Sequence, residues 1–112
     1  MFKMQRYTHE LKINPQYFNQ VRIGAKKAEF RRADRDFQVG DLLVLREFNA
    51  IPPREFRHLL HYGEYTGNMI RAVITDITCV NSIYPELGDK PQFVMLSFSI
   101  LEDDESWRTK PF

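Results

Sequence analysis

Several segments of this chain read as β-strands, and residues 5–13 and 27–31 alternate polar and apolar side chains with a period of two, the pattern of a strand that has one covered face. The segment 42–48, "LLVLREF", has the strongest β character, and Gly40-Asp41 before it predicts a sharp entry turn with a structural role for Asp41. Strands are predicted at residues 5–13, 27–31, 42–48, 69–78 and 92–101.

One early segment has a helical period instead. Asn14 is a good N-cap, Pro15 suits the first helical position, and Gly24 is a natural C-terminal stop. Phe18 and Val21 are spaced to face a core. Several strands with one early helix predict an α+β fold, a small closed or half-closed β-barrel of about five or six strands with helical decoration.

The remaining segments read as connections. Pro52-Pro53 excludes a central strand from residues 50–68, where a short helical turn through "REFRHLLHY" is predicted. The stretch "NSIYPELGDKP" before the last strand reads as a loop, and residues 102–112 as a mobile tail. A chain of 112 residues without repeats or a dividing linker is expected to form a single domain, residues 1–112.

Composition indicates a cytoplasmic protein without a membrane partner. The longest apolar runs, such as "LLVL", are much too short to span a bilayer, and the N-terminus has no signal-peptide pattern. The single cysteine, Cys79, has no internal disulfide partner and is expected to be a small buried residue. Neither a Gly-x-Ser-x-Gly elbow nor a glycine-rich phosphate loop is present, which excludes serine hydrolase and nucleotide hydrolase chemistry.

The net charge of +1 hides an uneven distribution. Residues 1–35 carry nine Lys and Arg against three acids, for a net charge of +6, and the rest of the chain carries −5. Such a basic part favours a polyanionic partner, although the two parts also neutralise each other if they fold together. Five bases stand close together around one glutamate, Glu29: Lys26, Lys27, Arg31, Arg32 and Arg35.

Alternation within "KKAEFRRAD" predicts which side chains share a face. Ala28 and Phe30 are expected on the covered face, with Lys27, Glu29 and Arg31 on the polar one. Glu29 and Arg31 then form either a surface ion pair or part of a site. Arg32 and Arg35 either extend a row of phosphate-binding residues or are solvent-exposed residues of a turn with no binding role.

The order Gly24-x-Lys26-x-x-Glu29-x-Arg31, followed by Gly40-Asp41, resembles the signature of ASCH domains, the PUA-like barrels associated with RNA. The chain is especially similar to short bacterial and phage ASCH-like proteins. That similarity is carried by "HELKI" at 9–13, "RDFQVGDLLVLREF" at 35–48, "YTG" at 65–67 and "QFVMLSFSIL" at 92–101.

The resemblance implies a basic cleft that binds RNA or a modified nucleoside. It places Lys26, Glu29 and Arg31 beside this cleft, with Tyr65 in a loop over it. Spacing from Gly24 favours Lys26 as the cleft lysine, whereas alternation favours Lys27. His9 is expected either to face the cleft with Lys12 or to be a satisfied, half-buried histidine. The nucleic-acid-binding candidates are therefore His9, Lys12, Lys26, Lys27, Glu29, Arg31, Arg32, Arg35 and Tyr65.

Two other functions remain open. One ASCH-like subfamily resembles this chain in its Gly-x-Lys stretch and removes the acetyl group from N4-acetylcytidine. The resemblance implies catalytic roles for Lys26 and Glu29 if this chain is such an enzyme, although Glu29 stands where that subfamily has a threonine. The acidic C-terminal part suggests a protein-interaction module, with its partners unspecified. No cofactor and no metal are expected, because His58 and His61 lack further ligands at a known spacing.

Overall fold

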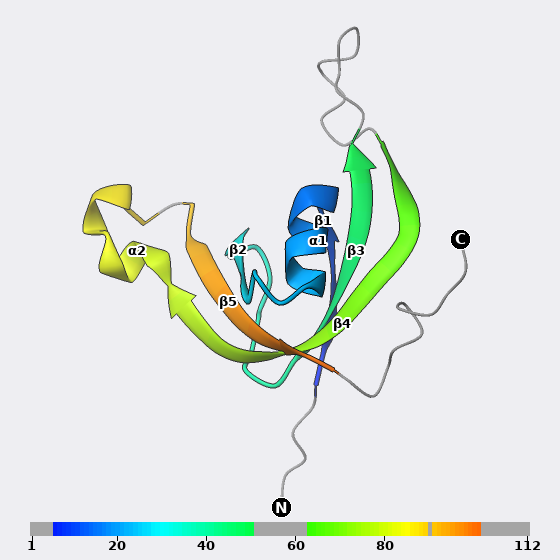
Figure 1. Cartoon of the computed structure of the whole chain (residues 1–112). Coiled ribbons are helices and arrows are strands. Elements are labelled where there is room, and N and C mark those ends of the chain that lie inside the picture. The colour runs from blue at the N-terminus through cyan, green and yellow to red at the C-terminus, as the bar shows by residue number, and fades with distance from the viewer. Residues whose placement is uncertain (1–5, 51–62, 90, 102–112) are drawn as a thin grey trace, which may run out of the picture.

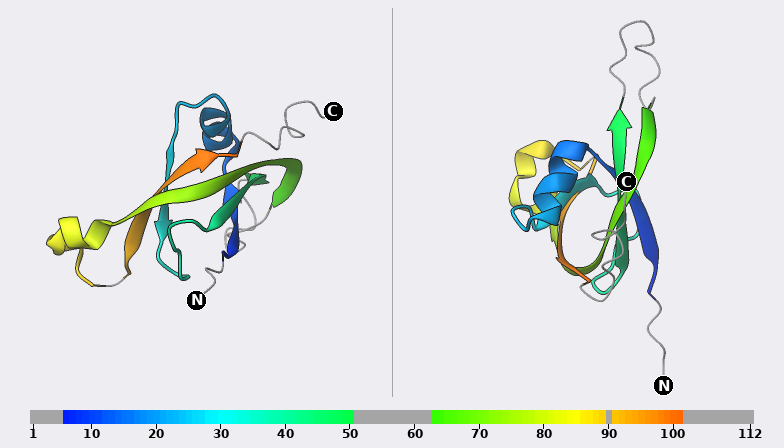
Figure 2. Two further views of the ribbon diagram at one scale, coloured as in Figure 1. Left: turned by 90° about the horizontal axis from the view of Figure 1, so that it is seen from below. Right: turned by 45° about the vertical axis from the view of Figure 1, so that its right-hand side comes forward.

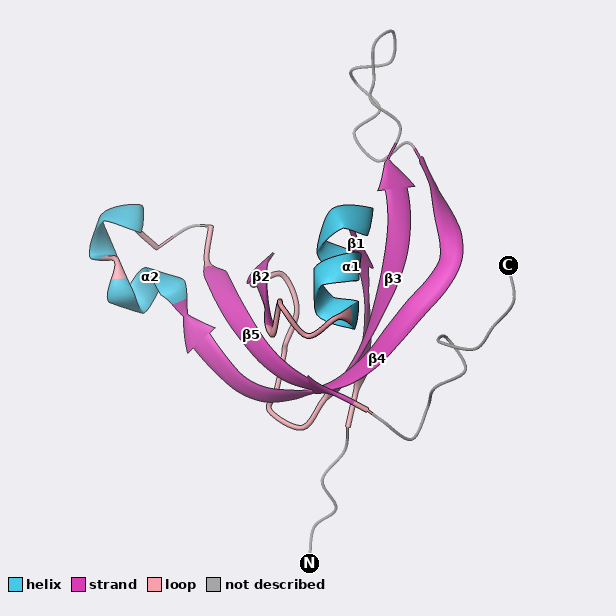
Figure 3. Cartoon of the chain, in the orientation of Figure 1, coloured by secondary structure: helices cyan, strands magenta, loops and turns pink. Residues whose placement is uncertain are grey.

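The computed structural model describes residues 6–50, 63–89 and 91–101, and its elements are arranged as drawn in Figure 1. Coloured by secondary structure in Figure 3, they are mostly strands. The strands are β1 (Thr8–Ile13), β2 (Ala28–Arg32), β3 (Leu42–Ala50), β4 (Gly63–Cys79) and β5 (Phe93–Ile100). The helices are α1 (Pro15–Arg22), α2 (Val80–Ile83) and the 3₁₀ turn η1 (Pro85–Leu87).

The five strands form one curled sheet in the order β1-β3-β4-β5-β2. β1 runs parallel to β3, and the other neighbours are antiparallel. Within the described residues, β1 and β2 each pair with one strand only, so the sheet is a half-barrel with two free edges. The prediction of a small closed or half-closed barrel is therefore confirmed in its half-closed form.

Helix α1 begins and ends where the local sequence signals place it. The Asn14 side chain accepts a hydrogen bond from the Gln16 amide, and Pro15 opens the helix. At the other end Gly24 has φ +84°, and the amides of Gly24 and Ala25 donate to the carbonyls of Val21 and Gln20. This is a Schellman motif, and it sets the direction in which the chain leaves toward β2.

The apolar core fills the concave face of the sheet. Phe18 and Val21 of α1 are buried there, as predicted. Figure 2 shows α1 inside the curl of the sheet and α2 at the end of β4, so the opposite face of β1, β3 and β4 carries no described helix. The other core residues are Leu11, Ile13, Phe37, Leu43, Leu45, Ile70, Ala72, Ile74, Val94, Leu96 and Phe98.

Several expected boundaries are corrected. β4 begins at Gly63 rather than at residue 69, because residues 63–65 pair with Ala50, Asn49 and Phe48 beyond a bulge at residues 66–68 of β4. The predicted loop after Cys79 contains α2 and η1, and Cys79 is half-buried rather than buried. The predicted turn through residues 54–62, with His58 and His61, and the tail at 102–112 lie outside the described residues.

No helix in the described part of the chain is long and apolar enough to cross a membrane.

Candidate functional site at the free edges of the sheet

Strand β2 presents to the core the face opposite to the predicted one. Glu29 is 7% exposed and Phe30 is 49% exposed, so the carboxylate points inward and the ring outward. The pairing with β5 explains this, because Glu29 stands opposite the buried Leu96 and Phe30 opposite Met95, and directly paired residues project to the same face. Phe30 instead stacks on Phe93 on the outer face of the sheet, with ring centroids 5.4 Å apart. The expectation that Phe30 faces the core is wrong.

The buried Glu29 carboxylate lies between two cations. Its Oε2 accepts from Nε of Arg31 at 3.0 Å and lies 2.9 Å from Nη2 of the same guanidinium. Its Oε1 lies 3.6 Å from Nζ of Lys26. Both cationic side chains are about one-quarter exposed, at 25% for Lys26 and 26% for Arg31. The carboxylate is therefore buried, while both of its cationic partners are partly exposed to solvent.

Two arginines reach from the β2 side of the half-barrel to the free edge of β1. Nη2 of Arg31 donates to the Lys12 carbonyl, and Nη1 of Arg35 donates to the Glu10 carbonyl at 3.4 Å. These two carbonyls face away from β3 and lack a ladder partner within the described strands. We call the side chains of Lys26, Glu29, Arg31 and Arg35 the charged seam.

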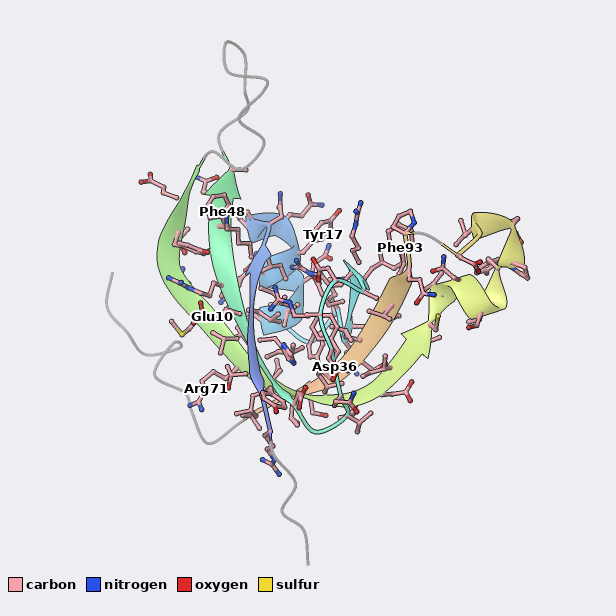
Figure 4. All side chains as sticks on the ribbon, turned by 180° about the vertical axis from the view of Figure 1, so that it is seen from behind. Glu10, Tyr17, Asp36, Phe48, Arg71 and Phe93 are labelled. Carbon is pink, nitrogen blue, oxygen red and sulfur yellow. The ribbon has the colours of Figure 1, made fainter. Side chains whose placement is uncertain are left out.

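Tyr17 borders the charged seam from α1. Its ring is 48% exposed, and Nζ of Lys26 lies 5.6 Å from the ring centroid. In Figure 4, Tyr17 lies along the upper rim of the half-barrel between Phe48 and Phe93. Lys27 is exposed, and Lys26 is the lysine that contacts Glu29. Of the two lysines between which the sequence left a choice, Lys26 is therefore the one that lies beside the carboxylate.

His9 lies apart from the seam as a satisfied buried histidine. Its Nε2 lies 2.8 Å from Oδ2 of Asp41, and its ring packs 4.8 Å from that of Phe37. Asp41 also accepts from the amides of Tyr7 and Gln38, which is the turn role predicted for it. Burial acts to raise the pKa of Asp41, but the hydrogen bonds from His9, Tyr7 and Gln38 together hold that pKa below its usual value.

Lys12 and Tyr65 belong to a second group of side chains on the outer face. Tyr65 lies within β4, not in a loop, and packs edge-on against Phe48 with centroids 5.1 Å apart. Arg46 lies 3.7 Å over the Tyr65 ring, and Lys12 lies 4.3 Å over the Phe48 ring. We call Lys12, Arg46, Phe48 and Tyr65 the outer cluster. The expectation that Tyr65 covers the seam from a loop is wrong.

The structure therefore divides the predicted binding residues into groups. Lys26, Glu29, Arg31 and Arg35 come together, whereas His9 points into the core and Lys12 lies with Tyr65 outside. Arg32 is exposed on the outer side of β2, on the face opposite to Glu29 and Arg31.

Sequence reasoning missed Tyr17, Arg46 and Phe48. Continuing the alternation of β3 past Leu45 would have placed Arg46 outside. No local signal would have revealed the position of Tyr17 beside Lys26, since the Schellman turn after α1 brings these two residues together.

The charged seam holds no candidate metal site. Among residues 6–50, 63–89 and 91–101, no three His, Cys, Asp or Glu side chains are grouped closely enough to bind a metal ion. The chemistry available at the seam is that of one carboxylate, one amine and two guanidinium groups. Such groups bind anions, accept hydrogen bonds from amines and relay protons.

Fold and site together define a small half-barrel protein with a charged free edge. The chain belongs to the family described as "Domain of unknown function (DUF3850)", whose model matches residues 8–98. It is also similar to the "uncharacterized 12.9 kDa protein in GpA 3′region" of Escherichia phage P2, with 37% identity over 75 residues. That match covers 67% of this chain and 58% of the phage protein. A phage relative agrees with the predicted similarity to phage proteins, while the relation to ASCH domains stays a prediction.

Proposed function

We propose that the charged seam binds RNA, or a modified nucleoside derived from it, with Glu29 contacting the base and the surrounding cations contacting phosphate. The observation that carries the proposal is the Glu29 carboxylate, buried at a free sheet edge between Lys26 and Arg31. The net charge of +6 on residues 1–35 and the resemblance to RNA-associated ASCH domains support the same function.

A buried carboxylate is an unfavourable choice if stability alone matters. Glu29 stands opposite Leu96 on the inner face, where an apolar side chain would pack without loss of hydration. Burying an ion pair costs several kcal/mol of desolvation per ion, and replacing such a pair with apolar residues is often neutral or stabilising. A carboxylate held in place by cations has a use in recognition, because it accepts hydrogen bonds from the exocyclic amines of bases.

The cations around Glu29 supply the other half of the recognition. Lys26, Arg31 and Arg35 outnumber the two acids beside them, Glu29 and the Asp34 carboxylate 3.8 Å from Arg35. Phosphate is the anion that such cations bind in nucleic acids. Tyr17 offers an exposed ring beside Lys26, suited to stacking on an unpaired base. Together these groups provide one hydrogen-bond acceptor, one stacking surface and several phosphate contacts.

The proposal is tested by fluorescence anisotropy with labelled single-stranded RNAs of different composition, at two salt concentrations. Wild-type protein is expected to bind with an affinity that falls as salt rises. The double variant K26A/R31A is expected to lose about 10-fold or more, and to lower the salt slope by about 0.7 for each phosphate contact removed. Affinity that changes with neither salt nor these substitutions would contradict the proposal.

Arg32 provides the matched control. R32A removes the same charge from the neighbouring position of the same strand, but on the outer face. It is expected to change affinity much less than R31A does. Thermal unfolding of each variant shows whether a loss of binding follows from a loss of folded protein.

A hydrolase acting on N4-acetylcytidine is the second candidate, supported by the 3.6 Å separation of Lys26 Nζ and Glu29 Oε1. In such an enzyme the pair would take a proton from water as the water oxygen bonds to the acetyl carbonyl carbon. It would then return this proton to N4 as the C–N4 bond breaks, which releases acetate and cytidine. Incubation with N4-acetylcytidine followed by mass spectrometry tests this. Release of cytidine by wild type and not by K26A would support the enzyme, and no release by wild type would reject it.

A further inference from the structure

We propose that the nucleic-acid-binding surface continues from the charged seam around the edge of β1 onto the outer face, where the outer cluster stacks unpaired bases. The ligand is then a single-stranded oligonucleotide and not a free nucleoside. This inference rests on the proposed function and names its substrate class.

The outer face of β1, β3 and β4 is available for a ligand. Helix α1 lies inside the curl of the sheet and α2 lies beyond the end of β4, so no described helix covers this face (Figure 2). Tyr65 is 41% exposed and Met69 is 38% exposed on this face. Figure 4 looks onto this side of the molecule, with Glu10 at β1 and Phe48 near the upper end of β3.

The outer cluster has the composition of a stacking platform for single strands. Cross-strand pairing brings its members together, because Lys12 stands opposite Arg46, and Phe48 stands opposite Tyr65. The Arg46 guanidinium over the Tyr65 ring forms one stacked unit, at 3.7 Å from its centroid. Unpaired bases stack both on aromatic rings and on guanidinium planes, while neighbouring cations bind the connecting phosphates.

Hydrogen bonds at a bulge in β4, residues 66–68, hold this platform in place. Glu47 lies where the register shifts between Arg46 and Phe48. Its Oε1 accepts from Thr66 Oγ1 at 2.8 Å and from Asn68 Nδ2 at 3.0 Å. These bonds tie β3 to the residues of β4 that directly follow Tyr65, and they help to keep the ring beside Phe48.

The outer cluster is continuous with the charged seam through β1. Arg31 and Arg35 donate to the carbonyls of Lys12 and Glu10 at the strand edge, and the Lys12 side chain extends from that same edge onto the outer face. Tyr65 lies two strands beyond β1, which is roughly 10 Å at the usual strand spacing. A strand of a few nucleotides covers this path, within the site sizes of about 4–16 nucleotides found for small single-strand-binding domains.

The position of the cations favours a nucleic acid over a protein partner. Lys12 and Arg46 lie directly over the two rings. The two acids nearby are already engaged, Glu10 with Arg46 at 3.4 Å and Glu47 with Thr66 and Asn68. Protein interfaces place aromatic residues in desolvated centres from which lysine is depleted. Rings flanked by partly exposed cations are better suited to bases joined by phosphates.

The test compares a labelled octanucleotide with a mononucleotide of the same base, using wild type, Y65L, Y65F and R46Q. Wild type is expected to bind the octamer at least about 10-fold more tightly than the mononucleotide. Y65L should weaken octamer binding by about 10-fold, the size of one lost stacking contact, without changing the salt slope. Y65F keeps the ring and should bind as wild type, whereas R46Q should lower both the affinity and the salt slope.

Tyr84 supplies the control, because it is 52% exposed but lies on the turn between α2 and η1. Y84L should leave octamer binding unchanged.

Equal affinity of wild type for octamer and mononucleotide, or equal octamer affinity of Y65L, Y84L and wild type, would overturn the inference and leave the proposed function standing. Binding of a polyglutamate peptide that Y65L abolishes, without any dependence on RNA length, would assign the cluster to an acidic protein partner and overturn it too. Failure of wild type to bind any RNA or nucleoside would overturn both proposals.

Discussion

Arg31 on β2 donates a hydrogen bond to the carbonyl of Lys12 on β1, so a single guanidinium links the two free edges of the sheet. The same guanidinium holds the buried carboxylate of Glu29. The half-barrel is thus joined across its open side by a side chain instead of a backbone ladder. A group in this position influences both the stability of the fold and the charge that a ligand meets.

Loss of Arg31 should destabilise the protein. R31A leaves Glu29 buried with Lys26 as its remaining ion-pair partner and leaves the Lys12 carbonyl without its donor. We expect the free energy of unfolding to fall by about 2–4 kcal/mol, measured by urea denaturation. R32A, on the exposed outer side of the same strand, should change it by less than about 0.5 kcal/mol. Equal effects of the two substitutions would show that the link across the edges contributes nothing.

A double variant at positions 29 and 31 distinguishes a role of the charged seam in stability from a role in RNA binding. Glu29→Leu combined with Arg31→Met removes the buried ion pair and supplies apolar side chains next to Leu96. We expect a stability close to that of wild type, because apolar replacement avoids the cost of desolvation. RNA binding should nevertheless be lost. If this variant binds RNA as wild type does, the seam has only a structural role.

Glu29→Gln tests what the carboxylate does for recognition. If Glu29 accepts a hydrogen bond from a base amine, E29Q should reduce the preference among RNAs of different composition while the salt slope stays unchanged. If Glu29 serves only as a partner for Arg31, the loss of a negative charge should leave binding intact or strengthen it. Anisotropy titrations with single-base RNAs distinguish these outcomes.

Asp41 should make stability depend on pH in the acid range. Because hydrogen bonds lower its pKa in the folded protein, its contribution is present above the unfolded value of about 3.9 and is lost as pH falls through the lower folded value. D41N should cost about 1–3 kcal/mol at pH 7, since the donors of His9, Tyr7 and Gln38 lose a charged acceptor. The difference between wild type and variant should shrink below about pH 4 in denaturation experiments. A difference that stays constant from pH 7 to pH 3 would contradict this assignment.

Cys79 should react faster than an ordinary thiol near neutral pH. The polar groups of the neighbouring Ser82 lower the pKa of the Cys79 thiol, although burial acts in the opposite direction. Alkylation by iodoacetamide should therefore be slower in S82A than in wild type at pH 7. The two rates should converge at high pH, where both thiols are ionised. Equal rates at pH 7 would show that Ser82 does not influence the thiolate.

The local signals of the sequence sufficed for the parts of the fold that depend on neighbouring residues. The N-cap of Asn14, the stop at Gly24 and the turn at Gly40-Asp41 need only the conformations and hydrogen bonds of a few adjacent residues. Alternation and β character likewise located each strand of the described residues, although β4 begins six residues earlier than predicted. That extension depends on pairing with β3, which no local pattern reports.

Tertiary structure alone decided which faces and edges meet. A period of two tells that Glu29 and Phe30 lie on opposite faces but not which face is inside, and the pairing of β2 with β5 made that choice. The same holds for the charged seam, whose residues come from the connection after α1, from β2 and from the loop after β2. They reach β1 through the curl of the sheet. Burial, ion pairing and edge contacts arise between segments that are distant in sequence. The sequence therefore identified the charged residues, but it could not predict their arrangement in space.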